Sequence, residues 1–474
     1  MKRAGWPLAV AVLAALASQD PRVAALALLA ALGVLAWRFP EPALEAAVWA
    51  VLVVRPSLDV FSERRYGLSL FVVSPAVALG VLVVITAAVL AVRRARVGRP
   101  VWTDPELRAP HLWLLAAYGI GLWSGLRWYG LGGAASGVRE VVRVASIVAA
   151  LLLVLWWVHG APGRYRRGWA YLVAGMLVPL TVAFWQLATG RGNLEVEGIN
   201  RLQGTFSNPN ALAPYLVPFI LVTIWGMPTA RGFGRLVRIG AAGGLTVLLA
   251  LTYSRTALIA LGAGLTVLPV LQAARSGARG LLRGVGVVGL LGALGWVLVG
   301  GLIRERFSDV SLGSAPFAMA RSGAWVDTFT WRLVNWNGLI RLGDRHPWTG
   351  HGAGMTTVLN PLVNEDGVPY NAHNDFVRFF FETGALGLIC YLLYGLLLAR
   401  WAWRRGRGGT SAARARTALA VTATWLALFF LTAGVTELSL QTALMYTLGG
   451  MLGLLDAPEV ASDFTAQPAA VRRR

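Results

Sequence analysis

The amino-acid sequence predicts an all-α fold, a polytopic transmembrane helical bundle. Hydrophobic residues make up 56% of the 474 residues and charged residues only 14%, whereas about 25% of residues are charged in soluble domains. Apolar runs of about 20 residues, the length that crosses a bilayer, recur along most of the chain. The composition therefore excludes a single large soluble core.

Cutting the chain at these runs gives about fourteen expected spans, and no fewer than about twelve. They lie near residues 6–18, 22–36, 42–54, 68–92, 111–126, 140–159, 169–189, 210–226, 238–253, 256–272, 285–302, 384–400, 416–433 and 436–454. Both termini then lie in the cytoplasm. The first run, which follows Lys2 and Arg3, also resembles a signal peptide, but the charge pattern is consistent when it is kept as a span.

The formal net charge of +21 would suit a nucleic-acid-binding protein, but it could also reflect membrane topology. The positions of the basic residues distinguish the two. In the expected topology, the inside segments hold 26 of the 43 Lys and Arg residues but only 6 of the 22 Asp and Glu residues. This asymmetry is the positive-inside pattern of membrane proteins. The basic excess therefore indicates topology, and nucleic acid is excluded as a partner.

The spans and their connections divide the chain into five parts. These are N-terminal transmembrane helices (1–168), transmembrane helices with arginine-bearing outer loops (169–302), an outer-side segment (303–383), C-terminal transmembrane helices (384–454) and a cytoplasmic tail (455–474).

The outer-side segment is too long to be a simple connection, because loops of this length are usually functional or disordered. Its composition is not that of a disordered segment. Phe329, Leu333, Trp336 and Ile340 follow helical spacing and form one apolar face. We expect a helix here that either lies on the outer membrane interface or packs as a lid on the bundle.

The first polar motif runs from Arg201 to Asn210 and enters an expected span. Asn208 is a good N-cap and Pro209 suits the first helical turn, so a helix should begin here. Its free N–H groups beside Arg201 would attract a phosphate. Alternatively, Arg201 only reaches towards lipid headgroups while the asparagines cap the helix.

The second motif, Thr252 to Thr256, is a polar break between two apolar runs on the outer side. Arg255 would lie at membrane depth, where an arginine is costly unless it meets an anion or a carboxylate. Its guanidinium suits the oxygens of a diphosphate, and it stays charged at any relevant pH. A structural ion pair is the alternative.

The third stretch contains three of the five histidines, His346, His351 and His373, on the outer side. Histidine is the usual general base near neutral pH. These histidines do not indicate a zinc site, because no HxxxH or HExxH spacing is present. The nearby glycines are also not a nucleotide loop, because no GK[ST] follows them.

Taken together, the three stretches resemble the O-antigen ligase/O-antigen polymerase family of polytopic membrane glycosyltransferases. The resemblance covers roughly residues 170–454. The matching positions are Arg201, Gly204, Asn208, Pro209, Asn210, Ser254, Arg255, Arg332, Trp336, Pro347, Gly350, Gly352, His373, Asn374, Glu382, Gly384 and Gly387.

The resemblance implies transfer of a glycan from an undecaprenyl-diphosphate carrier to a hydroxyl acceptor. It implies a multi-pass protein of the bacterial inner membrane, with its site facing the periplasm and with no metal and no cofactor. His373 would be the base that deprotonates the acceptor, and Arg201 and Arg255 would bind the diphosphate. Supporting roles would fall to Asn208, Asn210, Arg332, Trp336, Asn374 and Glu382, and whether Glu382 tunes His373 or caps a helix stays open.

Elementary chemistry agrees with this implied mechanism. A diphosphate leaving an anomeric carbon needs its charge stabilised rather than a proton supplied, and attack from the opposite side gives inversion. The expected partners are the lipid-linked donor, membrane lipids, and an acceptor that is either the lipid A core or another lipid-linked glycan.

Three alternatives to an O-antigen ligase remain at this point. A polymerase would join lipid-linked repeat units, and a protein O-oligosaccharyltransferase would use a protein hydroxyl. A transporter would place ionisable residues in mid-span and show an internal repeat. No repeat is visible, and the conspicuous polar residues lie at the outer rim.

Overall fold

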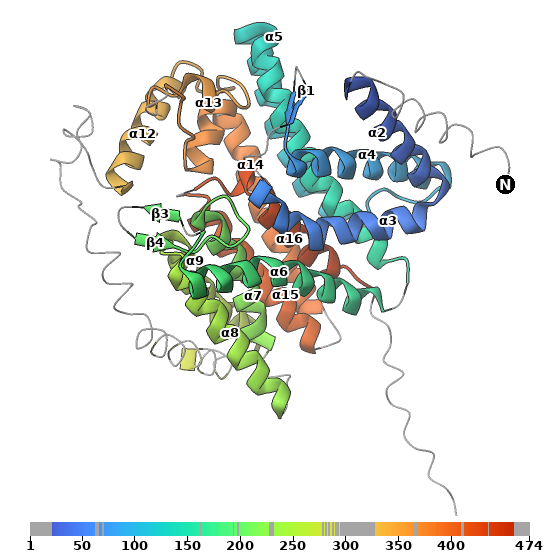
Figure 1. Ribbon diagram of the computed structural model, residues 1–474, viewed down its shortest axis with the longest axis vertical. Helices are drawn as coiled ribbons and strands as arrows, with labels where there is room; N and C mark the ends of the chain where they lie inside the picture. The colour runs from blue at the N-terminus through green and yellow to red at the C-terminus, as the bar shows by residue number, and fades with distance from the viewer. Residues whose placement is uncertain are drawn as a thin grey trace, which may run out of the picture.

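The computed structural model shows an all-α bundle with two short β-hairpins (Figure 1). It describes residues 21–61, 66–68, 71–161, 163–192, 194–196, 199–226, 232–276, 328–363, 367–408, 412–434 and 436–458, with a few isolated positions between 279 and 293. The expected span 6–18, nearly all of 285–302 and residues 303–327 of the outer-side segment lie outside this description.

The described helices fall into two halves along the chain. In the first half they are α2 (Pro21–Arg38), α3 (Pro40–Trp49) with the turns η1 (Ala50–Val54) and η2 (Arg55–Phe61), α4 (Pro75–Arg96), α5 (Pro105–Val158), α6 (Arg164–Thr189) and α7 (Pro209–Gly226). In the second half they are α8 (Phe233–Leu251), α9 (Arg255–Ser276), α12 (Thr328–Gly343), α13 (Thr356–Leu359), α14 (Asp375–Gly408), α15 (Ala412–Ala427) with η4 (Leu428–Thr432), η5 (Leu438–Leu440) and α16 (Thr442–Leu455).

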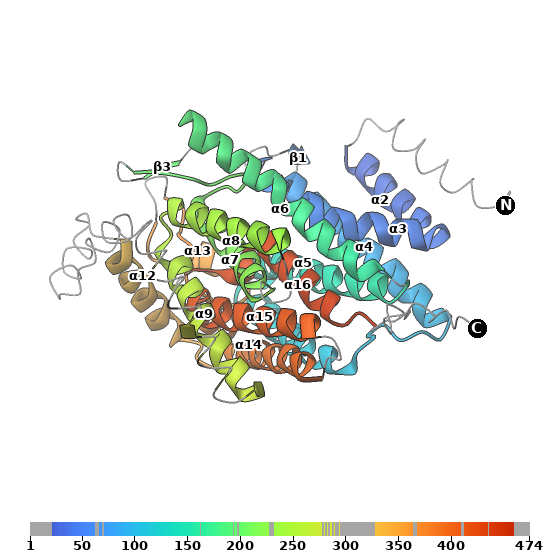
Figure 2. The same ribbon diagram turned by 90° about the horizontal axis from the view of Figure 1, so that it is seen from below.

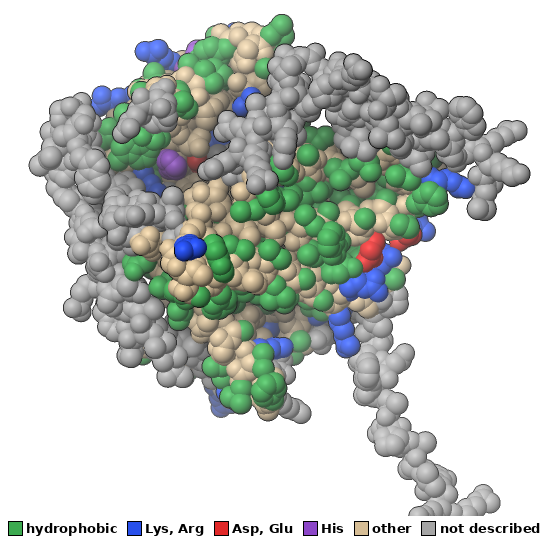
Figure 3. Space-filling model, in the orientation of Figure 1, with side chains coloured by type: hydrophobic (Ala, Val, Ile, Leu, Met, Phe, Trp, Pro, Cys, Tyr) green, Lys and Arg blue, Asp and Glu red, His purple; other side chains and the backbone are tan. Residues whose placement is uncertain are grey.

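Eight helices of the described chain are long and apolar enough to cross a membrane, which confirms a multi-span helical protein. They are α4, α5, α6, α7, α8, α9, α14 and α15 with η4. The exposed surface of α6 is itself apolar, with Leu177, Phe184 and Trp185 each about half exposed. Hydrophobic side chains cover much of the middle of the face in Figure 3. This is what lipid contact requires.

One expected span begins later than its hydropathy indicates. The apolar run from residue 68 was expected to be helical throughout, but β1 (Tyr66–Leu68) and β2 (Phe71–Val73) pair there as an antiparallel hairpin. α4 then begins after Ser74, whose Oγ accepts from the Val77 N–H at 3.4 Å. A β-branched pair such as Val72-Val73 suits a strand as well as a helix, so hydropathy alone could not set this boundary.

α5 holds two expected spans, 111–126 and 140–159, folded back on each other. Gly130 joins the arms with φ 62° and ψ −147°, a conformation open almost only to glycine. A Cβ on Gly133 would lie 2.3 Å from the carbonyl oxygen of Gly125. At the far ends of the arms, Trp156 Nε1 donates to the Val101 carbonyl at 2.7 Å. α5 is therefore a helical hairpin with its tip at Gly130.

α14 folds back in the same way at Gly384, which has φ 65° and ψ −170°. The short arm from Asp375 packs against the long arm, because the Tyr391 hydroxyl donates to Asp375 at 2.9 Å. The Tyr391 ring also stacks on Phe379 with ring centroids 3.9 Å apart. The long arm then runs beside α15 through the bundle (Figure 2).

Candidate active site

Polar and charged residues gather in two groups at opposite ends of the bundle, and each group is a candidate for a functional site. The histidine end comprises the α5 tip, α12, α13, the start of α14 and the connection 433–441. The basic end comprises residues 103–105, His159, residues 404–414 and residues 455–458. Because Asp104 and His159 flank the base of the α5 hairpin and Gly130 forms its tip, the two ends lie at opposite ends of that hairpin.

The arginine motifs lie at the same end as His373, as a series of contacts shows. The Thr205 hydroxyl in the Arg201 loop donates to the Pro56 carbonyl at 2.9 Å. The adjacent Arg55 donates to Thr442 at 2.7 Å, at the end of the connection 433–441. The Asn374 amide donates to Gly434 of this connection at 2.8 Å. The hairpin β3 (Leu194–Val196)–β4 (Ile199–Arg201) and α12 lie on the same side of the molecule in Figures 1 and 2.

Arg201 joins the first two sequence motifs. It ends β4, and its side chain is only 6% exposed. Its Nε donates to the Thr252 carbonyl at 2.8 Å, and its Nη2 donates to the Asn210 side chain at 2.9 Å. Leu202 N–H also donates to the Leu251 carbonyl at 3.2 Å. The loop entering α7 and the turn between α8 and α9 are thus held together by one guanidinium.

The helix starts in this region follow the sequence prediction. α7 begins at Pro209, and the Asn208 carbonyl accepts from the Ala211 N–H at 3.1 Å, as an N-cap residue does. Arg255 is the first residue of α9, after a turn in which Tyr253 takes a left-handed φ of 53°. Arg255 is half-buried and follows the buried Ser254.

His373 lies in a strained turn directly before α14. Its φ is 52°, a value that non-glycine residues adopt rarely and at a cost of about 1–3 kcal/mol. The neighbouring peptide groups are held from two sides. The Ala372 carbonyl accepts from Trp336 Nε1 at 2.8 Å, and the Asp375 N–H donates to the Ala433 carbonyl at 2.7 Å. The turn is therefore fixed by α12 and by the connection 433–441 together.

The environment of His373 keeps its imidazole neutral. The ring meets Trp331 edge-on, with centroids 5.6 Å apart. Burial lowers the pKa of His373 to about 4, and the nearby Arg332 adds to this lowering. A neutral imidazole is the form that can accept a proton.

α12 lies where the sequence predicts a helix, and it packs against α14. Its buried positions include Thr330, Asn335 and Leu339, whereas Ile340 of the expected apolar face is 41% exposed. The Asn335 amide donates to the Asn371 carbonyl at 2.9 Å. α12 thus holds the chain that leads to His373, and it brings Arg332 and Trp336 with it.

His351 has a structural environment, unlike His373. Its Nε2 lies 2.9 Å from the Leu342 carbonyl, which can only accept, and its Nδ1 lies 2.6 Å from the Tyr129 hydroxyl. The neutral ring therefore donates from Nε2 and accepts at Nδ1. His346 stacks on Trp128 of the α5 tip, with centroids 4.1 Å apart. Both histidines join residues 346–354, which we call the glycine-rich turn, to α5.

The glycine-rich turn fits closely between the two helical hairpins. The Gly352 N–H donates to the Glu382 carbonyl at 2.8 Å, and the Ala353 N–H donates to the Gly121 carbonyl at 3.1 Å. Gly352 has φ 119°, and a Cβ there would lie 2.5 Å from the Gly125 Cα. The turn thus needs glycine for its conformation and for the close approach of α5.

The sequence did not reveal the ionic network beneath the site. Arg378, only 3% exposed, contacts Glu140 at 2.6 Å and Glu382 at 3.2 Å, and it donates to Ser439 at 3.1 Å. Glu382 also accepts from the Thr356 N–H at 3.4 Å. The Glu382 carboxylate therefore joins α14 to α13. A buried arginine within an apolar helix is the signal that could have pointed to this network.

A second buried carboxylate, Asp375, joins α14 to the connection 433–441. It accepts from the Ser439 N–H at 2.9 Å and from the Ser439 hydroxyl at 2.6 Å. Asn374 caps the same helix by accepting from the Val377 N–H at 3.0 Å. The start of α14 is thus held in place by polar contacts on all sides, which suits a site that must hold a base rigidly.

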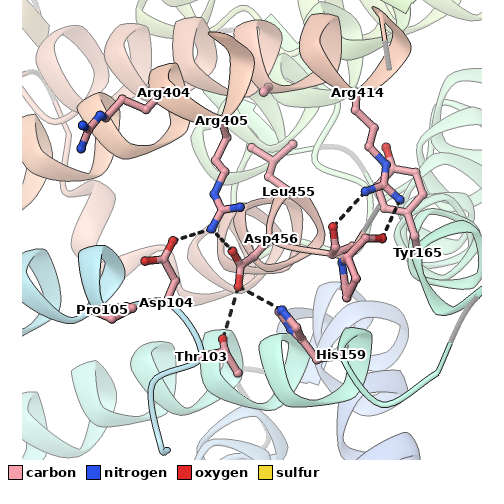
Figure 4. A pocket seen from close by; sticks show the side chains of 13 residues that line it. Thr103, Asp104, Pro105, His159, Tyr165, Arg404, Arg405, Arg414, Leu455 and Asp456 are labelled. Atoms are coloured by element: carbon pink, nitrogen blue, oxygen red, sulfur yellow. Dashed lines mark hydrogen bonds and ion pairs between the residues drawn. The ribbon is translucent and has the colours of Figure 1, made fainter. Parts of the chain in front are cut away.

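A cavity of about 630 Å³ lies at the basic end, away from His373 (Figure 4). Arg405 joins its walls by pairing with Asp104 at 2.5 Å and with Asp456. Burial acts to raise the pKa of Asp104, but hydrogen bonds from Trp401 and Arg405 hold it below its usual range. This cluster ties the base of α5 to the ends of α14 and α16.

Among the described residues, no three His, Cys, Asp or Glu side chains are grouped so that they could hold a metal ion.

Residues 240–392 match the family model described as O-antigen ligase. No curated protein matches the chain. The matched region begins in α8 and ends in the long arm of α14, so it contains Arg255, the glycine-rich turn, His373 and Glu382, whereas Arg201 precedes it. This match supports the resemblance of the region that carries His373 to the O-antigen ligase family.

Proposed function

We propose that this membrane protein is an O-antigen ligase that moves a glycan from an undecaprenyl-diphosphate carrier to a hydroxyl of the lipid A core. The reaction takes place on the outer face of the inner membrane, inverts the anomeric centre and needs no metal. The observation that carries the proposal is the rigid, neutral His373 at the same end of the bundle as Arg201 and Arg255.

His373 is the proposed base. It takes the proton of the acceptor hydroxyl as the hydroxyl oxygen attacks the anomeric carbon, and the bond from that carbon to the diphosphate oxygen breaks. Because burial lowers the pKa of His373 to about 4, its imidazole is neutral, the form that can accept a proton, from pH 5 to pH 8. A positioned base typically contributes about 10²–10⁴-fold to a rate.

Arg201 and Arg255 are the proposed diphosphate ligands. The leaving group carries its charge away without a proton, so fixed cations stabilise the transition state. Support comes from the shared turn, since Arg201 binds the carbonyl of Thr252 while Arg255 begins α9 three residues later. Asn210 fixes the Arg201 guanidinium by accepting from Nη2.

The test is a comparison of lipid-linked and surface glycan in a strain lacking the protein. A ligase predicts that long glycan disappears from the lipid A core while long chains accumulate on the carrier. Single repeats stalled on the carrier would mean a polymerase. Glycan missing only from proteins would mean a protein O-oligosaccharyltransferase, and unchanged glycan on every acceptor would refute glycan transfer.

The purified protein gives a second test. With lipid-linked donor and lipid A core acceptor, transfer should proceed unchanged in EDTA. Inhibition by EDTA that zinc reverses would replace the proposed base mechanism by a metal site.

A further inference from the structure

A buried glutamine near the end of α6 binds the backbone of the Arg201 loop through four hydrogen bonds. The side chain of Gln186 is only 3% exposed. Its Oε1 accepts from the N–H of Gln203 at 3.2 Å and from the N–H of Gly204 at 2.9 Å. Its Nε2 donates to the carbonyl of Gly192 at 2.8 Å and to the carbonyl of Gly204 at 3.3 Å. A carboxamide has two N–H donors and two acceptor positions, so its whole hydrogen-bonding capacity is used here.

The four partners also fix the direction in which the carboxamide points. Backbone N–H groups only donate and backbone carbonyls only accept, so the oxygen of Gln186 faces Gln203 while its nitrogen faces Gly192. The reversed carboxamide would set donors against donors and oxygen against oxygen. Each buried polar group left unsatisfied costs about 1–3 kcal/mol, so the observed orientation is strongly favoured.

These contacts close the base of the hairpin that carries Arg201. Gly192 precedes β3 and Gln203 follows β4, and the register of the hairpin pairs Leu194 with Arg201. Arg201 is the last residue of β4, two positions before Gln203. One carboxamide on α6 thus binds the chain just before the hairpin and just after it.

Gly204 brings the same loop against α6 at a second point. Its φ is 59°, and a Cβ there would lie 2.8 Å from the carbonyl oxygen of Pro179. Pro179 lies seven residues before Gln186, so about two helical turns place both residues on the same face of α6. The close approach of Gly204 to this face keeps its backbone within reach of the carboxamide.

Different elements therefore hold the backbone and the guanidinium of Arg201. Gln186 of α6 holds the backbone on either side of the hairpin, whereas Thr252 and Asn210 accept from the guanidinium. A cation that stabilises charge in a transition state acts best when it is placed before the reaction begins. The contacts of Gln186 provide such placement for the chain that bears the cation.

We propose that Gln186 is a positioning residue for Arg201. Its carboxamide fixes the base of the β3–β4 hairpin so that the guanidinium meets the diphosphate of the donor, and it acts through Arg201 rather than by touching the reacting atoms. This inference rests on the proposed glycan transfer. It adds to that reaction a residue that precedes the matched region 240–392.

The experiment is a double-mutant cycle in the purified transfer assay, with Gln186→Leu, Arg201→Lys and the double variant. Leucine has a similar size but makes no hydrogen bond. We expect kcat/KM for the lipid-linked donor to fall about 10- to 100-fold in Gln186→Leu, because a misplaced group loses its effect on the transition state. KM for the acceptor should not change. Since both substitutions act on one cation, the loss in the double variant should fall well short of the product of the two single losses.

Two further variants complete the comparison. Gln186→Glu has the same shape and keeps an oxygen towards Gln203, but it sets its second oxygen against the carbonyls of Gly192 and Gly204. Its donor kcat/KM should also fall by at least about tenfold. Thr189→Val, at an exposed position in the last turn of α6, is the matched control and should behave like the unaltered protein.

A second readout needs no glycan substrate. Amide hydrogen exchange of a peptide containing residues 202–206 should be faster in Gln186→Leu than in the unaltered protein, and unchanged in Thr189→Val. Absence of transfer by the unaltered protein would refute the proposed function, while faster exchange would still support the contact. If the protein transfers glycan and the Leu variant keeps its donor kcat/KM, or if the two single losses multiply in the double variant, the inference is wrong. Should the Leu variant fail to insert, the same cycle with Gln186→Glu decides.

Discussion

The hydroxyl oxygen of Tyr129 lies 2.6 Å from Nδ1 of His351, across 222 positions of sequence. This contact joins the tip of the α5 hairpin to the glycine-rich turn. Because the opposite nitrogen, Nε2, lies 2.9 Å from the Leu342 carbonyl, both ring nitrogens of His351 are engaged in structure. His351 therefore has a structural role, and His373 is the histidine that we expect to act as the base.

His373→Ala should abolish detectable glycan transfer, a loss of at least about 10²-fold, without lowering the amount of protein in the membrane. The folded-state pKa of His373, about 4, is lower than its usual 6.5, so the base form is present throughout pH 5 to 8 and is lost only below that range. Transfer by the purified variant measures the effect. His346→Ala, which removes a ring that stacks on Trp128, is the control and should stay active. An active His373→Ala protein would remove this residue from the chemistry.

Arg201→Lys and Arg255→Lys should each lower the rate by at least about tenfold, because an ammonium cannot make a bidentate contact to phosphate oxygens. At Arg201 a lysine could also replace only one of the two contacts, to Thr252 or to Asn210. Steady-state kinetics with the lipid-linked donor should show the loss. Arg191→Lys, at an exposed position before β3, should have no effect. Full activity of both variants at normal protein levels would leave the diphosphate role unsupported.

Gly352→Ala should prevent the glycine-rich turn from packing against α5, since its Cβ would lie 2.5 Å from the Gly125 Cα at a φ of 119°. We expect a loss of several kcal/mol in stability or failure to accumulate, beyond the roughly 1–2 kcal/mol of a left-handed backbone alone. Gly367→Ala is a matched control, because Gly367 has φ 74° with no atom within 4 Å of the added Cβ. Thermal unfolding in detergent compares the two. Equal stability of both variants would contradict the close approach.

The proposed orientation predicts which cysteines a membrane-impermeant thiol reagent can reach in spheroplasts. In a Cys390→Ser background, Arg191→Cys and Val363→Cys should be labelled, because both positions are exposed at the histidine end. Val97→Cys and Arg407→Cys, exposed on the expected inner side, should be labelled only after lysis. The positive-inside pattern is the physical basis. Labelling of position 97 in intact spheroplasts would reverse the orientation.

The sequence by itself determined the class of protein and its candidate chemistry. Apolar runs of membrane length specify spanning helices, because a backbone in lipid must satisfy its hydrogen bonds internally. The helix start at Pro209 also followed from the sequence, since capping is a property of adjacent residues. Arg201, Arg255 and His373 were recognisable as polar residues in an apolar chain.

Only the tertiary structure decided what surrounds those residues. The apolar pattern of residues 105–158 does not specify a reversal at Gly130, because hydropathy reports burial and not chain direction. The left-handed turn of His373 depends on Trp336 and Ala433, which lie 37 and 60 residues away from it in sequence. Arg378 acquires Glu140 and Ser439 as partners through packing between elements that lie far apart in sequence, which the neighbours of Arg378 along the chain do not specify.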